Sequence, residues 1–184
     1  MKLYQEKCVI DMLSVQANLE KIMAKDTIVT LLKYKRWIDS ETLKTINVIN
    51  ESAYAEKRHL MLRLMNHIHV VDMIFRANIS GQQHGYTALN TPETPSVDEL
   101  EVKMAGGADW YIQHINSMTS ADLGETIKFS FVDGGDGEMT AVDMLNHMLF
   151  HGTYHRGAVG WLISECGGVP PKDVLTVFLR DHNH

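Results

Sequence analysis

NHMLFHGTYHRG, residues 146–157, places His147, His151 and His155 four residues apart in succession. Four residues are nearly one turn of an α-helix, so on a helix the three imidazoles form a narrow stripe with neighbours about 6 Å apart. Two histidines at this spacing can bind the same metal ion, as they do in helical zinc motifs. The stretch therefore predicts a helix that carries a candidate metal-binding pair.

The residues that continue this stripe are apolar. Met144 precedes the histidines, and Ala158 and Leu162 follow them on the same helical face. We therefore expect the stripe to face the core. An unpaired polar group in a core costs on the order of 1 to 3 kcal/mol, so these imidazoles need partners there. A shared metal ion would be one.

A third ligand has to come from another helix, and LMNHIHVVDMIF (64–75) offers His67 and His69. His67 shares a helical face with Leu64 and Val71, whereas His69 is rotated by about 200° from it. His67 is thus the core-facing candidate. Three neutral imidazoles and a water molecule would form an open site for a borderline ion such as Zn²⁺ or Ni²⁺.

Alternatively, each core histidine forms a hydrogen bond and binds no metal. The protein would then be a helical bundle without an ion. For the remaining histidines we expect a solvated or hydrogen-bonded role: His59, His69, His84, His114, His182 and His184.

Helical spacing and end signals predict four longer helices, over residues 26–49, 52–79, 96–118 and 140–166. Ser96 with Glu99, and Thr140 with Asp143, have the spacing of capping boxes. Gly167 can adopt the left-handed conformation that ends the last helix. We expect an all-α four-helix bundle with antiparallel neighbours.

The segments between these helices are of two kinds. Residues 80–96 are rich in Gly, Pro, Thr and Asn and predict a long loop. Residues 126–131 alternate like a short strand before the Gly-rich reversal at 131–140, which predicts a small hairpin or extended loop before the last long helix. The first 25 residues and residues 173–180 are expected to be additional helices.

Length and composition indicate one ordinary globular domain over residues 1–184, with 45% hydrophobic and 22% charged residues. A net charge of −6 argues against direct binding to nucleic acid. No run of about 18 apolar residues is present, so we expect a soluble protein with no membrane partner.

Two features favour the cytoplasm. The N-terminal stretch has charges within its apolar part and resembles no secretory signal. Cys8 and Cys166 are far apart and form no CxxC pair, which fits free, half-buried thiols in a reducing compartment.

HMLFHGTYHRG resembles the signature of the DinB-like (damage-inducible, YfiT-like) metalloprotein family. LLKYKRWIDSETL (31–43) resembles the first helix of that family, and MNHIHVVDMIF (65–75) resembles its second helix, in which one histidine is a ligand. The resemblance covers roughly residues 31–166. It implies a four-helix bundle, the metal ligands His67, His151 and His155, and a homodimer. His147 is left as a neighbour or cavity wall.

Several neighbouring residues allow two interpretations. Arg156 points away from the stripe, which favours a structural salt bridge or an interface role. Gly152 and Gly157 suggest close approach of another helix, because glycine destabilises a helix by up to ~1 kcal/mol.

The remaining candidates are aromatic or acidic. Tyr34 and Trp37 could line a substrate cavity, although a core role is favoured. Asp72 and Tyr154 could orient the ligand imidazoles.

Two functional hypotheses follow, and the catalytic residues are unknown. The resemblance implies an enzyme that acts on a small molecule, as a thiol-dependent transferase or isomerase or as a hydrolase, in which the ion activates a low-molecular-weight thiol or water. No carboxylate on the stripe serves as a general base, which weakens simple hydrolysis. The alternative is a non-catalytic metal-binding stress-response protein.

Overall fold

The computed structural model describes the backbone of residues 2–182 and the side chains of residues 25–182. The side chains of Cys8 and His184 lie outside this description. In chain order the elements are α1 (Lys2–Asn47), α2 (Glu51–Ile79), α3 (Val97–Ser117), α4 (Ser120–Leu123), β1 (Thr126–Ser130), β2 (Asp136–Thr140), α5 (Ala141–Glu165) and α6 (Leu175–His182). No helix in the described part is long and apolar enough to cross a membrane.

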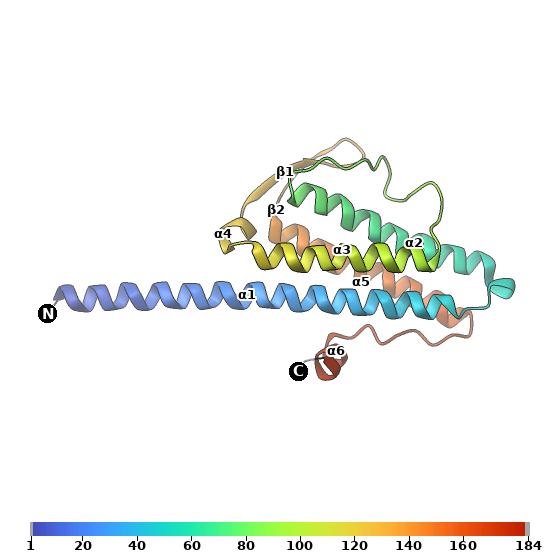
Figure 1. Ribbon diagram of the computed structural model, residues 1–184, viewed down its shortest axis with the longest axis horizontal. Helices are drawn as coiled ribbons and strands as arrows, with labels where there is room; N and C mark the ends of the chain where they lie inside the picture. Colours follow the sequence, from blue (N-terminus) through green and yellow to red (C-terminus); the bar gives the residue numbers. More distant parts are fainter. Residues whose placement is uncertain (1, 183–184) are drawn as a thin grey trace.

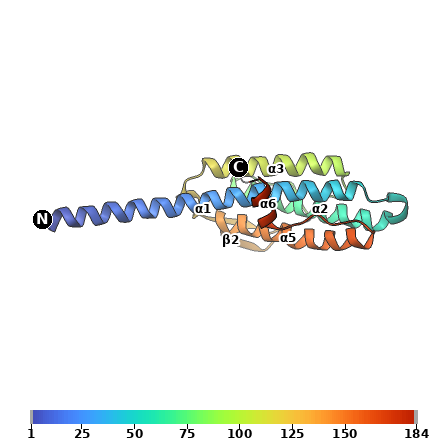
Figure 2. The same ribbon diagram turned by 90° about the horizontal axis from the view of Figure 1, so that it is seen from below.

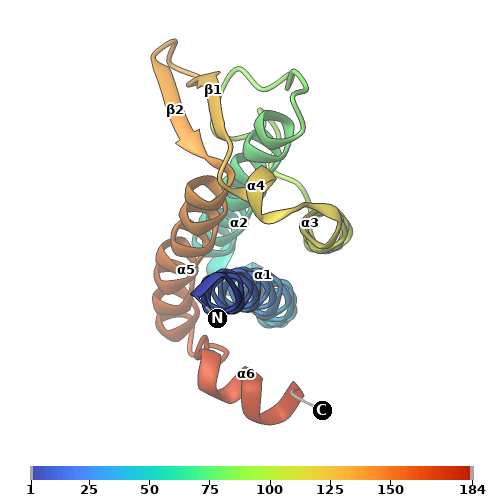
Figure 3. The same ribbon diagram turned by 90° about the vertical axis from the view of Figure 1, so that its left-hand side faces the viewer.

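The long helices α1, α2, α3 and α5 form the expected bundle (Figure 1). Viewed along the bundle, α1 lies between α3 and α5, and α2 contacts both from the other side (Figure 3). The N-terminal part of α1 extends well beyond the other helices (Figure 2). The fold class predicted from the sequence is confirmed.

Local hydrogen bonds explain the helix boundaries. The hydroxyls of Ser96 and Thr140 accept from the backbone N–H of Glu99 and Asp143, whose carboxylates accept in return, so both predicted capping boxes are confirmed. Gly167, at φ +75°, follows the end of α5 as expected.

Residues 2–25 are helical as expected, but they do not form a separate helix: α1 is continuous from Lys2, so the predicted start at residue 26 is wrong. Residues 2–25 contain neither Gly nor Pro, so nothing in the backbone interrupts the helix there. The short helix α4 was missed, although Thr119 and Asp122 form a third capping box. The hairpin is confirmed: β1 pairs antiparallel with β2, with Thr126 opposite Thr140.

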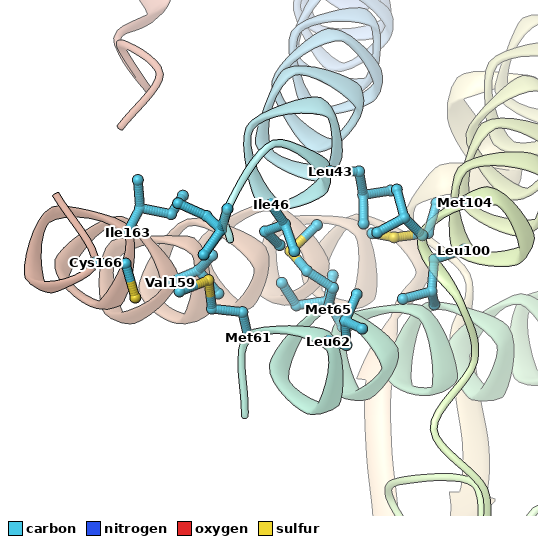
Figure 4. Packing of buried hydrophobic residues seen from close by; sticks show 13 residues of the cluster. Leu43, Ile46, Met61, Leu62, Met65, Leu100, Met104, Val159, Ile163 and Cys166 are labelled. Atoms are coloured by element: carbon cyan, nitrogen blue, oxygen red, sulfur yellow. The ribbon is translucent and has the colours of Figure 1, made fainter. Parts of the chain in front are cut away.

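Apolar side chains from all four long helices fill the bundle. One cluster joins the C-terminal parts of α1 and α5 to α2 and α3 (Figure 4). A second cluster lies nearer the hairpin and includes Val71, Phe75, Tyr111 and Met144. Tyr34 is buried against Phe178 of α6, which confirms its core role, and Trp37 packs on both residues while it is only partly buried.

A buried ionic cluster crosses the bundle beside these apolar groups. Arg156 of α5 donates to Asp39 of α1 and to Asp173, each at 2.9 Å. Lys35 of α1 donates to Asp39 and to Asp72 of α2, each at 2.7 Å. Arg156 is only 4% exposed, so its structural salt-bridge role is confirmed. Removing one partner of such a buried pair typically costs about 3–5 kcal/mol.

The two helix glycines differ. A Cβ on Gly152 would lie 2.9 Å from the Arg156 guanidinium and 3.3 Å from Lys35, so this glycine permits the close approach of α1 and α5. Gly157 has no atom within 4 Å of such a Cβ, so no described helix of the same chain approaches it closely.

His69 of α2 was expected to be solvated or hydrogen-bonded, and the structure corrects this expectation for its Nδ1 atom. Its side chain is buried at 7% exposure, and Nδ1 has no hydrogen-bond partner among the described residues. Burial lowers its pKa from 6.5 to about 4, and the positive charges of Lys103 and Lys35 add to the effect. The histidine is therefore neutral in the folded protein at neutral pH.

This burial predicts a pH-dependent stability. As the pH falls below 6.5, the unfolded chain binds a proton at His69 before the folded chain does, so the folded state loses stability down to about pH 4. Between pH 8 and pH 5 this residue alone should lower the free energy of unfolding by about 2 kcal/mol. Urea unfolding of His69→Leu at both values should show a drop smaller by that amount.

Exposed His59 on the same helix provides the control. His59→Leu should leave the wild-type drop unchanged. An equal drop in wild type and His69→Leu would contradict the assignment.

Candidate metal centre

The site lies where α2 and α5 run antiparallel. In the observed register Lys57 of α2 forms a salt bridge with Glu165 at the end of α5, at 2.9 Å. In this register His67 of α2 meets His151 and His155 of α5, with ring centroids 4.8 and 4.6 Å away. The structure thus brings together the three histidines that the sequence predicted as ligands.

The three side chains offer ligand nitrogens that all lie within 4.8 Å of one another. The Nε2 atoms of His67 and His151 are 3.0 Å apart. Two imidazole nitrogens bound to one tetrahedral zinc at about 2.0–2.1 Å lie roughly 3.3 Å apart, so this spacing is close to that of a bound pair. Among the described residues this is the one such group of histidine, cysteine or acidic side chains.

The orientation of His67 comes from a backbone group. Its Nδ1 lies 2.7 Å from the carbonyl oxygen of Leu89, in the connection between α2 and α3. A carbonyl only accepts, so Nδ1 carries the proton and donates it. In the neutral imidazole this leaves the lone pair on Nε2, which faces His151. Ligand histidines in metal sites are commonly held this way.

The protonation of the α5 histidines also suits a cation. Burial, followed by the charges of His155, His67 and His147, lowers the pKa of His151 from 6.5 to about 3. Burial and then His67 lower the pKa of His155. Both imidazoles are therefore neutral near pH 7, so their lone pairs are free. Three imidazole nitrogen donors without a carboxylate are a set that fits Zn²⁺ or Ni²⁺.

The histidine stripe borders the core instead of facing it, which corrects the sequence prediction. His151 and His155 are half-buried, while His147 and Ala158 are exposed. The core-facing side of α5 is displaced around the helix, and Arg156 belongs to it. The hydrophobic pattern of the sequence could not reveal this displacement, because it counts Arg156 as a polar, exposed residue.

His147 stays outside the group of three. Its ring stacks on that of His151 and contacts that of Phe75, with ring centroids 5.4 and 5.1 Å apart. It stands beside the site in the manner expected of a wall residue.

The two candidate orienting residues do not hold a ligand imidazole by a hydrogen bond. Asp72 pairs with Lys35, and burial raises its pKa to about 6. Tyr154 is 77% exposed and touches the edge of His155, with ring centroids 5.1 Å apart. Sequence reasoning missed Leu89, because any residue supplies a backbone carbonyl and no side-chain signal marks this one.

The comparison with protein families agrees with this geometry. The model of the DinB family matches residues 19–182, which include α2, α5 and all three histidines. No curated protein matches the chain. The family match extends beyond both ends of the resemblance seen in the sequence. Since it spans nearly the whole chain, the protein belongs to the DinB family.

Proposed function

We propose that the protein binds one divalent ion, Zn²⁺ or Ni²⁺, through His67, His151 and His155, and that it is a thiol-dependent transferase acting on a small molecule. The observation that carries the proposal is the group of three imidazoles at the border of the core, in which burial lowers the pKa of His151 and of His155. Three protein ligands leave at least one coordination position for an exogenous group. A divalent ion at such a position lowers the pKa of a bound thiol or water.

Thiol activation is favoured over hydrolysis by the groups around the site. Metal hydrolases use a carboxylate or similar group as a general base for water. No described carboxylate is hydrogen-bonded to any of the three histidines, and Asp72 pairs with Lys35 through Oδ2. A thiol needs less help, because metal coordination itself favours the thiolate.

A purely structural ion is the second candidate. The half-burial of His151 and His155 and the exposure of His147 argue against it, because they leave the site within reach of solvent. We further propose that the chain is one domain and acts in the cytoplasm. The buried free thiol of Cys166 supports a reducing compartment.

Metal content tests the ligand set. Purified wild type should contain about one ion per chain, and His67→Ala, His151→Ala and His155→Ala should each lose it, because two imidazoles hold a divalent ion weakly. Elemental analysis after dialysis against Zn²⁺ measures this. His147→Ala, beside the site, and exposed His59→Ala should retain the ion. Loss in His147→Ala alone, or no ion in wild type, would refute the assignment.

Thiol coordination tests the reaction class. With Co²⁺ in place of the native ion, adding N-acetylcysteine should produce a sulfur-to-cobalt charge-transfer band in the near ultraviolet, since the thiolate would enter the open position. His151→Ala should show no band. If the spectrum of the Co²⁺-loaded wild type does not change when the thiol is added, thiol transfer is refuted, and hydrolysis or a structural role of the ion remains.

We also propose that the chain forms a homodimer through the outer face of α5. Phe150, Tyr154 and Trp161 are 69–77% exposed on this face. Between residues 144 and 164, α5 has one Lys, Arg, Asp or Glu, which is Arg156, and this residue is buried. Protein interfaces are enriched in aromatic residues and depleted of charge at their centres.

A second copy suits this face for two reasons. An antiparallel pairing of two α5 helices about residues 157–158 would place Trp161 of one copy against Tyr154 of the other, with the small residues Gly157 and Ala158 between them. An uncharged face also avoids the repulsion that a net charge of −6 per chain would otherwise cause.

Light scattering tests the dimer. The wild type should have twice the chain mass of 20.8 kDa at micromolar concentration. Trp161→Glu should be monomeric, because it places two like charges in an apolar interface. Val102→Glu is the control, since Val102 is 74% exposed on α3. A monomeric wild type, or a dimeric Trp161→Glu, would count against this interface.

A further inference from the structure

The connection between α2 and α3, residues 80–96, runs back along α2 before it reaches α3 (Figure 1). Its composition predicted a long loop, but side chains of α2 hold it at one place. Asn66, which is fully buried, donates through Nδ2 to the side-chain oxygen of Asn90 and to Oγ1 of Thr91, the latter at 2.8 Å. Nδ2 of Asn90 donates to the carbonyl of Arg63 at 3.1 Å.

Two more bonds complete this contact. The guanidinium of Arg63 donates to the carbonyl of Thr91 at 2.5 Å, and Oγ1 of Thr91 donates to the carbonyl of Glu93 at 2.6 Å. We call the contacts among Arg63, Asn66, Asn90 and Thr91 the loop clamp. It pairs several side-chain donors with acceptors, while Oδ1 of Asn66 has no partner among the described residues, and it restricts residues 90–91 more than one hydrogen bond would.

The clamp adjoins the candidate ligand on both sides. Asn66 directly precedes His67 on α2, and Asn90 directly follows Leu89, whose carbonyl accepts from Nδ1 of His67 at 2.7 Å. Two consecutive residues of the helix therefore hold three consecutive residues of the connection. A shift of the connection would carry the Leu89 carbonyl away from the imidazole.

We propose that Asn66 is a positioning residue, and that the loop clamp holds His67 as the Nδ1–H tautomer with Nε2 aimed at the metal site. The part concerning metal affinity rests on the proposed function. The part concerning the tautomer does not, because it follows from the contact of His67 with Leu89 alone. Without the clamp, His67 can exchange its tautomer and rotate away from His151.

The experiment compares Asn66→Leu with Asn78→Leu. Asn78 lies farther along the same helix, and its Nδ2 has no partner among the described residues, so it controls for the substitution itself. Side-chain ¹⁵N NMR of the metal-free protein, with His67→Gln to assign the signal, reports the tautomer directly. Titration with Co²⁺ alone reports affinity.

Wild type and Asn78→Leu should show His67 protonated at Nδ1, whereas Asn66→Leu should show a mixture of tautomers. Co²⁺ affinity should fall roughly 10- to 100-fold in Asn66→Leu, as for other residues that orient metal ligands, and within about twofold in Asn78→Leu. If Asn66→Leu does not fold, Thr91→Val removes one clamp acceptor from the loop side and should give the same changes.

The possible results separate the clamp from the metal site. A folded Asn66→Leu or Thr91→Val with the wild-type tautomer and unchanged Co²⁺ affinity would overturn the proposal. A wild type that binds no Co²⁺, with a tautomer that still changes in Asn66→Leu, would support the clamp and refute the metal function. Loss of affinity equally in Asn78→Leu would show a general structural effect and overturn the specific role of Asn66.

Discussion

The burial of Arg156 is the constraint on which the arrangement of the site depends. Its guanidinium reaches Asp39 of α1 and Asp173, and a charge that is so deeply buried tolerates no loss of its partners. Successive residues of a helix are about 100° apart, so turning Arg156 toward α1 directs His155 and His151 toward α2. An ion pair outside the site thus determines which face of α5 meets His67.

The fold does not need an ion to hold α2 and α5 together. Apolar clusters that include residues of both helices lie toward either end of their contact, and none of the three histidines belongs to them. Structural zinc sites, in contrast, supply folding energy that a small core lacks. Burial also lowers the pKa of His151 and of His155, and the Leu89 carbonyl orients His67. Such preorganisation suits a site that exchanges a ligand at an open position.

Local signals in the sequence were enough for most element boundaries, because caps and turns depend on neighbouring residues. Thr140 and Gly167 are examples, and the hairpin is another. The start of α1 has no such signal, so only the structure shows that the helix is continuous from Lys2. The direction of the α5 stripe was misjudged for a different reason. Hydrophobic periodicity treats Arg156 as exposed, whereas its carboxylate partners lie far away in sequence and allow it to be buried.

The same limit applies to the candidate site at finer scale. The identities of His67, His151 and His155 could be predicted, since histidine spacing on two helices is visible in the sequence. The carbonyl of Leu89 could not, because every residue has one and only the tertiary fold selects this one. The position of this carbonyl depends on the side chain of Asn66, which forms no described hydrogen bond with His151 or His155. Residue 89 can therefore vary in type with little effect on the site, whereas position 66 requires a buried amide.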